Sequence, residues 1–201
     1  MDILIATRNP GKFKEISSML AETGARFLSP ADLGITEDFD ETNGETYEDN
    51  ALGKARFYGK RAKDMIVVAD DSGLIVEALK GELGVQTRRW GAGEKATDEE
   101  WLDFFMNRMK GEEERSAGFV CAAAIRFPSG MEEVFTKQTP GEILREIKAA
   151  IKPGIPLSSV FLPEGYDKVY ASMTNEEKNK LSHRGKAFAE VLNYLKNHPN
   201  D

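Results

Sequence analysis

The chain has 201 residues, of which 40% are hydrophobic and 30% charged, and its formal net charge is −7. This balance is typical of a globular protein, and the acidic charge disfavours binding to the phosphate backbone of DNA or RNA. No apolar run approaches the roughly 18 residues of a membrane span, and the first residues lack a basic leader pattern, so we expect a cytoplasmic protein without membrane contact.

The first third of the chain alternates between predicted strands and helices. Residues 2–6 predict a strand, and the apolar spacing over 13–20 predicts a helix that a Pro-Gly turn opens. Residues 29–46 are polar and predict a loop with one short strand. A second helix is predicted over 47–63, and the β-branched run at 65–69 predicts a buried strand.

The rest of the chain predicts three helices and a hairpin. A Thr-x-x-Glu capping signal predicts a helix over 97–110, and strands near 117–127 and 131–137 are joined by a Pro-Ser-Gly turn. Isoleucines spaced by four indicate a helix over 142–151, and the last helix is predicted over 182–197, with Ser182 at its N-cap. Without repeats or a long linker, this alternation predicts a single α/β domain over 1–201 with a mixed sheet.

The segment Asp70-Asp71-Ser72-Gly73 directly follows the predicted buried strand. Two adjacent carboxylates there are costly, because they repel each other and neither can enter the core. A bound cation, or a role for one of them as a base, would explain the pair, and Gly73 would allow a sharp turn. The alternative is an ordinary polar exit from the strand.

Residues 7–12 form a turn between the first strand and the first helix. The N-terminus of a helix binds phosphate through its backbone N–H groups, and here Thr7 and Asn9 add side-chain donors while Arg8 and Lys12 add positive charge. The spacing is not that of a Walker A motif. The alternative is a surface loop that happens to carry a lysine.

Two further segments carry polar residues at helix starts. Asp49 and Lys54 lie near one face of the second helix, which suggests a metal-binding carboxylate beside a phosphate-binding lysine. The alternative is that Asp49 only helps to cap the helix, after Thr46 at its N-cap. His183 and Arg184 begin the last helix, where they attract an anion or are merely solvated.

Any metal must be held by oxygen ligands. The chain has one cysteine and two histidines, which excludes cysteine-based zinc sites and multi-histidine sites. Oxygen ligands favour magnesium, with manganese as the other candidate. Cys121 lies in an apolar strand and is expected to be a buried, inert thiol.

Three blocks of this sequence, in order, resemble the inosine triphosphate pyrophosphatase family, also called the Ham1 family. The blocks cover nearly the whole chain and read Thr7-Arg8-Asn9-x-x-Lys12-x-x-Glu15 with Asp49-Asn50-Ala51-x-x-Lys54-Ala55, then Asp70-Asp71-Ser72-Gly73-Leu74 with Ala78-Leu79-x-Gly81-x-x-Gly84, then Lys178 with Ser182-His183-Arg184-x-x-Ala187.

The resemblance implies an enzyme that hydrolyses non-standard purine nucleoside triphosphates, such as ITP, XTP and dITP, to the monophosphate and pyrophosphate with magnesium. It also implies a long twisted mixed sheet flanked by helices, two lobes with a central cleft, and a homodimer. The roles implied by position are general base and metal ligand for Asp71, second metal ligand for Asp49, phosphate binding for Thr7, Arg8, Asn9, Lys12, Lys54 and Ser72, and nucleotide contact for Lys178, His183 and Arg184.

The chain departs from the family pattern at three places. Asp49 stands where the family usually has Glu, and Arg88-Arg89 replaces a smaller pair. Residues 155–161 replace the family's Phe-Gly-Tyr-Asp segment, which ordinarily stacks on the base, so we expect an altered base preference. A relative that binds a nucleotide without hydrolysing it is the alternative. A phosphatase with a covalent aspartate is less consistent with adjacent acids, because that chemistry generally uses acids two residues apart.

Overall fold

The computed structural model describes residues 1–41, 44–84, 90–93 and 95–198. The chain divides into two compact units. The first unit comprises Met1–Ser72, Cys121–Lys137 and His183–Asp201, and the second comprises Gly73–Val120 and Gln138–Ser182. Each unit is described by itself.

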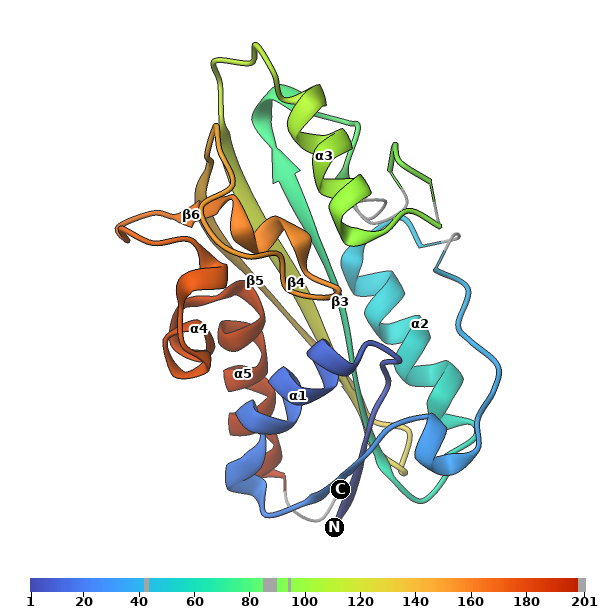
Figure 1. Ribbon diagram of the computed structural model, residues 1–201. Helices are drawn as coiled ribbons and strands as arrows, with labels where there is room; N and C mark the ends of the chain where they lie inside the picture. Colours follow the sequence, from blue (N-terminus) through green and yellow to red (C-terminus); the bar gives the residue numbers. More distant parts are fainter. Residues whose placement is uncertain (42–43, 85–89, 94, 199–201) are drawn as a thin grey trace. The chain divides into compact units, whose positions relative to one another are not determined.

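The strands form a six-stranded mixed sheet in the order β2-β1-β3-β4-β5-β6 (Figure 1). Their bounds are β1 Asp2–Ile5, β2 Arg26–Leu28, β3 Ile66–Val76, β4 Ser116–Arg126, β5 Glu132–Ile143 and β6 Phe161–Pro163. β1 pairs in parallel with β2 and β3, whereas β5 and β6 are antiparallel. The five α-helices of the described residues are α1 Pro10–Met19, α2 Tyr47–Gly59, α3 Asp98–Arg108, α4 Asn175–Leu181 and α5 His183–Asn197.

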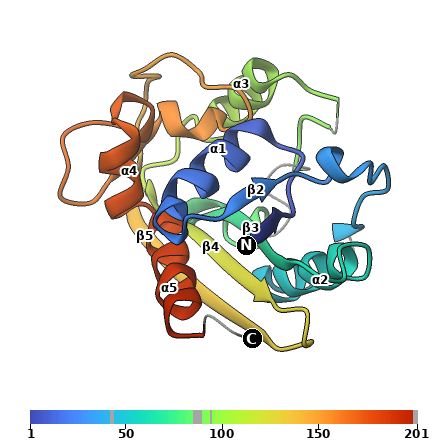
Figure 2. The same ribbon diagram turned by 90° about the horizontal axis from the view of Figure 1, so that it is seen from below.

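In the first unit, helices cover both faces of β1, β3 and β4. Because side chains alternate along a strand, Ile66 and Val68 join a cluster with α1 and α5, while Val67 and Ala69 join another with α2. Figure 2 shows α2 on the opposite side of these strands from α5. Any side chain on β3 in this unit therefore faces either α1 and α5 or α2.

The second unit has its own apolar core. Trp101 and Phe105 of α3 stack with their ring centroids 5.6 Å apart, and they pack in one cluster with residues of β3 and β6. A capping box between Thr97 and Glu100 opens α3, as the sequence predicted.

Most predicted elements are confirmed. α2 begins at Tyr47 behind the Thr46 cap and α5 begins at His183, although α2 ends at Gly59 rather than near residue 63. The hairpin between β4 and β5 is present, with Gly130 at a φ of 95°. Cys121 is fully buried as expected. Among the described residues, no helix is long and apolar enough to cross a membrane.

Two predicted elements were wrong, and so was the predicted end of the strand before Asp70. The predicted helix over 142–151 is absent, because Ile143 ends β5 inside the core while Ile147 is 45% exposed. The short strand expected within 29–46 lies earlier, at Arg26–Leu28, and the described part of that loop holds no strand. α4 was not predicted.

The third error concerns the acidic segment. Asp70 and Asp71 do not follow the end of a strand, since β3 continues through them to Val76. Gly73 has no positive φ and makes no turn. The strand continues because each acid finds partners on its own side of the sheet.

Candidate active site

Asp70 and Asp71 are buried on opposite faces of β3. Asp70 is 1% exposed and lies on the face covered by α1 and α5, whereas Asp71 is 6% exposed and faces α2. The two carboxylates therefore have different neighbours, and the expectation of a mutually repelling pair at a strand mouth is replaced by two separate sites.

Asp70 is surrounded by cations. Its carboxylate lies 3.0 Å from Lys12 Nζ and 3.1 Å from Arg184 Nε, and it accepts a hydrogen bond from the Ser72 hydroxyl at 2.9 Å. Burial would raise the pKa of Asp70, but the charges of Lys12 and Arg184 outweigh it and hold this pKa well below its ordinary value. Asp70 thus stays ionised and anchors two cations.

Arg184 is itself buried and uses its guanidinium on three neighbours. Besides Asp70, it donates through Nη1 to Glu15 at 2.8 Å and through Nη2 to the Ser72 hydroxyl at 3.3 Å. Burial would lower the pKa of Arg184, but Asp70 and Glu15 raise it above its ordinary value. These contacts tie the start of α5 to β3 and α1.

Asp71 is held by two neutral donors. Asn50 Nδ2 donates to one carboxylate oxygen at 2.9 Å, and the backbone N–H of Ser72 donates to the other, also at 2.9 Å. Burial raises the pKa of Asp71 above its ordinary value, although Lys54 and Lys12 act against this. Since the pKa values of the two acids move in opposite directions, Asp71 is the one suited to accept a proton.

The buried polar face of α2 holds β3 from one side. Lys54 lies one turn after Asn50, donates to the backbone carbonyl of Asp70 at 2.9 Å, and forms an ion pair with Glu41. Burial lowers the pKa of Lys54, but Glu41 and Asp70 raise it above its ordinary value. Lys54 is therefore a buried cation that contacts the backbone of Asp70 and the side chain of Glu41.

The 7–12 loop uses much of its polarity internally. Asn9 caps α1 by accepting from the backbone N–H groups of Gly11 and Lys12 at 2.8 and 3.2 Å, and the Thr7 hydroxyl accepts from Asn9 N–H at 3.2 Å. Arg8 donates to carbonyls at residues 35 and 37. Within the described residues, Lys12 is the one residue of this loop whose side chain pairs with an acid of β3.

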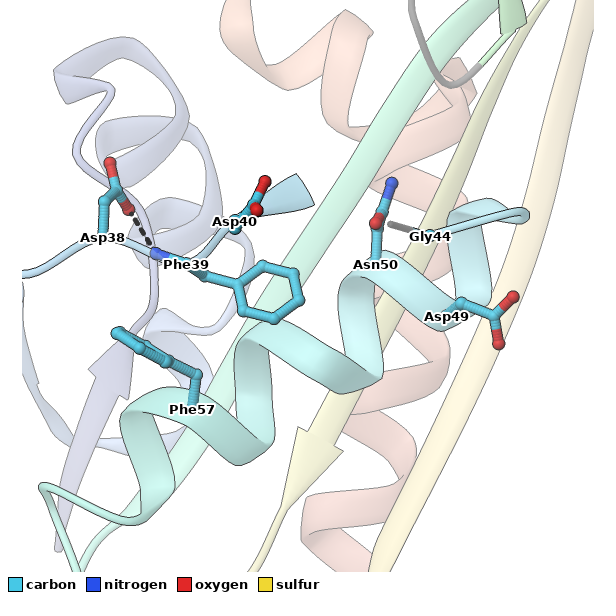
Figure 3. A pocket seen from close by; sticks show the side chains of 7 residues that line it. All are labelled: Asp38, Phe39, Asp40, Gly44, Asp49, Asn50 and Phe57. Carbon is cyan, nitrogen blue, oxygen red and sulfur yellow. Dashed lines mark hydrogen bonds between the residues drawn. The ribbon is translucent and has the colours of Figure 1, made fainter. Parts of the chain in front are cut away.

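Asp49 does not contact Asp71; its neighbour Asn50 does. The Asp49 carboxylate accepts from the Thr46 hydroxyl at 2.8 Å, and Asp49 and Asn50 leave α2 in different directions (Figure 3). Both line a pocket of about 450 Å³ together with Asp38, Phe39, Asp40, Gly44 and Phe57.

Two other predicted residues are buried at helix positions. Lys178 lies on α4 in the second unit, and His183 is the first residue of α5 in the first unit. Sequence reasoning missed Glu41 and assigned no role to Glu15 or Asn50, although both stand in the family blocks. Asn50 left a further signal, because it lies four residues before Lys54 and so on the same face of the helix.

The replaced family segment forms a short, buried 3₁₀ helix at Pro156–Ser159 in the second unit. Its hydroxyls serve the turn, since Ser158 donates to the carbonyl of Ile155 at 2.6 Å and Ser159 donates to that of Pro156 at 2.7 Å. Arg88 and Arg89 lie outside the described residues.

Several oxygen atoms that could hold a cation lie on α2 and in the segment before it. Asn50 Oδ1 is buried without a hydrogen-bond partner, and Asp49 and Glu41 add carboxylates on and beside α2. Within the described parts of the chain, no three His, Cys, Asp or Glu residues come together as a metal site. The donors present nevertheless fit a hard cation that takes part of its shell from water or phosphate.

Fold and site together define an α/β protein in which two buried acids on opposite faces of one strand lie among three cations. Comparison with known proteins identifies its family. The chain belongs to the Ham1 family, whose model matches residues 3–194. It is 36% identical to the dITP/XTP pyrophosphatase of Bacillus subtilis over 196 residues, 96% of each chain, and 41% identical to that of Thermoanaerobacter pseudethanolicus over 197 residues, 97% of this chain and 96% of the relative.

Solved structures agree with this assignment. The Ham1 protein of Staphylococcus aureus is 31% identical and superposes with a TM-score of 0.83, covering 98% of this chain and all of the other. A dITP/XTP pyrophosphatase from Mycobacterium abscessus is 37% identical with a TM-score of 0.71, covering 96% and 99%. The family resemblance and the α/β fold with a mixed sheet are thereby confirmed.

Proposed function

We propose that this protein is a magnesium-dependent nucleoside triphosphate pyrophosphatase that hydrolyses ITP, XTP and dITP to the monophosphate and pyrophosphate. The observation that carries the proposal is Asp71, a buried carboxylate with a raised pKa, fixed by Asn50 and Ser72 beside Lys12 and Lys54. The names of the relatives support the substrate class.

In the proposed reaction, Asp71 accepts a proton from a water molecule that attacks the α-phosphorus. The bond between the α-phosphorus and the bridging oxygen breaks, and pyrophosphate leaves with that oxygen and the bonding electrons. Asn50 and Ser72 N–H hold both carboxylate oxygens, so Asp71 keeps one orientation. Lys12 and Lys54 each carry three ammonium protons, which leaves donors for phosphate oxygens beside the contacts of Lys12 with Asp70 and of Lys54 with Asp70 and Glu41.

The magnesium ion would be held by Asp71 and Asp49, with Glu41 as a third candidate that the geometry adds. When bound, it would neutralise phosphate charge and make the water more acidic. Glu41 is paired with Lys54, and its charge raises the pKa of Asp71, so it lies in the electrostatic environment of that carboxylate. Comparing Asp49→Asn with Glu41→Gln decides between them, because the variant of the true ligand requires more magnesium for half-maximal rate.

Nucleotide contacts at Thr7, Asn9, Ser72, Lys178 and His183 stay predictions from the family pattern. For Arg184 the same pattern implies contact with the nucleotide, while its three intramolecular contacts support an anchoring role as well. We expect the altered base preference to follow from the buried 3₁₀ helix at Pro156–Ser159, which carries no aromatic ring to stack on a base. A single cytoplasmic domain acting as a homodimer completes the proposal.

The test is to incubate the protein with ITP, XTP, dITP, ATP or GTP and magnesium and to identify the products by phosphorus NMR. Pyrophosphate and monophosphate are expected, and Asp71→Asn should lose turnover while Asp64→Asn, at an unrelated acid, keeps it. Orthophosphate alone, or no turnover of any nucleotide, would overturn the proposal. Tight binding by calorimetry without turnover would favour the alternative of a nucleotide-binding relative.

A further inference from the structure

The side chain of Arg8 leaves the 7–12 loop and reaches the segment at residues 35–41. Its Nη2 donates to the carbonyl of Ile35 at 3.0 Å and to that of Glu37 at 2.8 Å, and its Nε lies 3.5 Å from a carboxylate oxygen of Asp38. One guanidinium thus joins two carbonyls and one carboxylate of the same short segment. Lys12, the other cation of this loop, instead pairs with Asp70.

The same segment is fixed to α2 through Asp38. The carboxylate oxygen Oδ1 accepts from the Tyr58 hydroxyl at 2.8 Å. It also accepts from the backbone N–H of Phe39 at 3.0 Å (Figure 3). Tyr58 is 1% exposed, so its phenol is immobilised in the core next to Ala55 and gives Asp38 a fixed partner. Asp38 therefore links Arg8 to α2.

Phe39 and Glu41 extend the contact along α2 toward the acids. The Phe39 ring fills the space above Gly53, where a Cβ would lie 2.5 Å from a ring carbon, and its centroid is 6.0 Å from that of Phe57. Glu41 then pairs with Lys54, which donates to the Asp70 carbonyl. The 35–41 segment is therefore held by Arg8 near its start and by Lys54 at its end.

We infer that Arg8 is a positioning residue, which holds the 35–41 segment and thereby Glu41 against Lys54, rather than a phosphate ligand. A planar guanidinium can serve two carbonyls and a carboxylate at once, whereas a lysine ammonium offers no such fork. Without Arg8, both carbonyls lose a charged donor and Asp38 loses its counter-charge. Displacement of about 1 Å at a site can cost up to about a hundredfold in rate.

The inference rests on the proposed function and is tested with Arg8→Ala, Arg8→Lys, Asp38→Asn and the double variant Arg8→Ala/Asp38→Asn. The control is Arg26→Ala, since Arg26 pairs with Asp2 at the surface and its side chain is 70% exposed. Four quantities are measured: kcat and KM for ITP, the inhibition constant of pyrophosphate, and amide hydrogen exchange of peptides covering 35–41.

A positioning role predicts that Arg8→Ala and Asp38→Asn each lower kcat by about tenfold or more, and that the double variant is no worse than the stronger single one. The pyrophosphate inhibition constant should change by less than about twofold, and exchange over 35–41 should accelerate in both variants. Arg8→Lys should restore only part of the rate, and Arg26→Ala should match the wild type.

Two results would overturn the inference. A phosphate ligand at Arg8 would weaken pyrophosphate inhibition by about tenfold in Arg8→Ala and leave it unchanged in Asp38→Asn. Unchanged exchange over 35–41 in Arg8→Ala would equally refute the positioning role. If the wild type turns over no nucleotide, the proposed function fails, and the exchange measurement still decides the role of Arg8.

Discussion

Replacing Arg184 by Met should destabilise the protein far more than removing an exposed arginine with a similar ion pair. Arg184 is buried and its contacts with Asp70, Glu15 and Ser72 lie between 2.8 and 3.3 Å. Met preserves much of the side-chain volume while deleting every donor. The buried carboxylate of Asp70 would then keep its charge, with Lys12 as its remaining ion-pair partner.

The size of the effect follows from leaving a buried charge partly uncompensated. Removing one partner of a buried pair costs about 3–5 kcal/mol. For a chain of this length, each kcal/mol lowers the melting temperature by about 2–4 °C, so the expected decrease is about 6–20 °C. Arg184→Lys should fall between the wild type and Met, because an ammonium keeps the charge and cannot reach Asp70 and Glu15 with the same fork.

The matched control is Arg56→Met in the same unit. Like Arg184, Arg56 uses two nitrogens on carboxylate, here both on Glu132 at 2.8 and 2.7 Å, but its side chain is 56% exposed. A surface pair of this kind contributes at most about 1 kcal/mol. Urea unfolding followed by circular dichroism, with thermal melts alongside, measures both variants. Equal losses for Arg184→Met and Arg56→Met would refute the argument that burial makes the Arg184 contacts decisive.

Three further outcomes are expected. Asn50→Ala should lower turnover of ITP by about ten- to a hundredfold, because Asp71 loses the donor that fixes one of its oxygens; a wild-type kcat would contradict this. Gly44→Ala should act in the same direction, since a Cβ there would overlap Asn50 Oδ1 and push its amide away from Asp71, and an unchanged kcat would count against it. Burial raises the pKa of Cys121 to about 12, so iodoacetamide at pH 8 should label this thiol only in the unfolded protein. Intact-mass spectrometry measures the labelling, and rapid labelling of the native protein would refute the burial argument.

Local signals in the sequence predicted four of the five α-helices of the described residues and the hairpin. Thr97 and Glu100 form the capping box that the pattern indicates, and Thr174 and Glu177 form another that opens α4. The second pair carries the same signal and predicts the start of α4 equally well. Capping involves residues three apart, so it can be recognised without knowledge of the fold.

Long-range contacts could not be predicted in this way. Arg184 meets Asp70 and Glu15 across 114 and 169 residues of sequence, and no local pattern indicates that these three side chains share one buried space. Asn9 shows the converse case. Its Oδ1 caps α1, which is the local use that an Asn before Pro-Gly favours, and its role as a phosphate donor stays a prediction.

The acidic segment shows how a correct principle led to a wrong boundary. Burying a carboxylate is costly, and this suggested that the strand ends before Asp70. The apolar residues Leu74 and Val76 beyond it belong to the same strand, and a strand that continues must place neighbouring side chains on opposite faces. Had β3 been extended through the acids, the alternation alone would have separated Asp70 from Asp71. Their placement on separate faces therefore follows from strand geometry, and only their partners, Arg184 on one face and Asn50 on the other, require the folded chain.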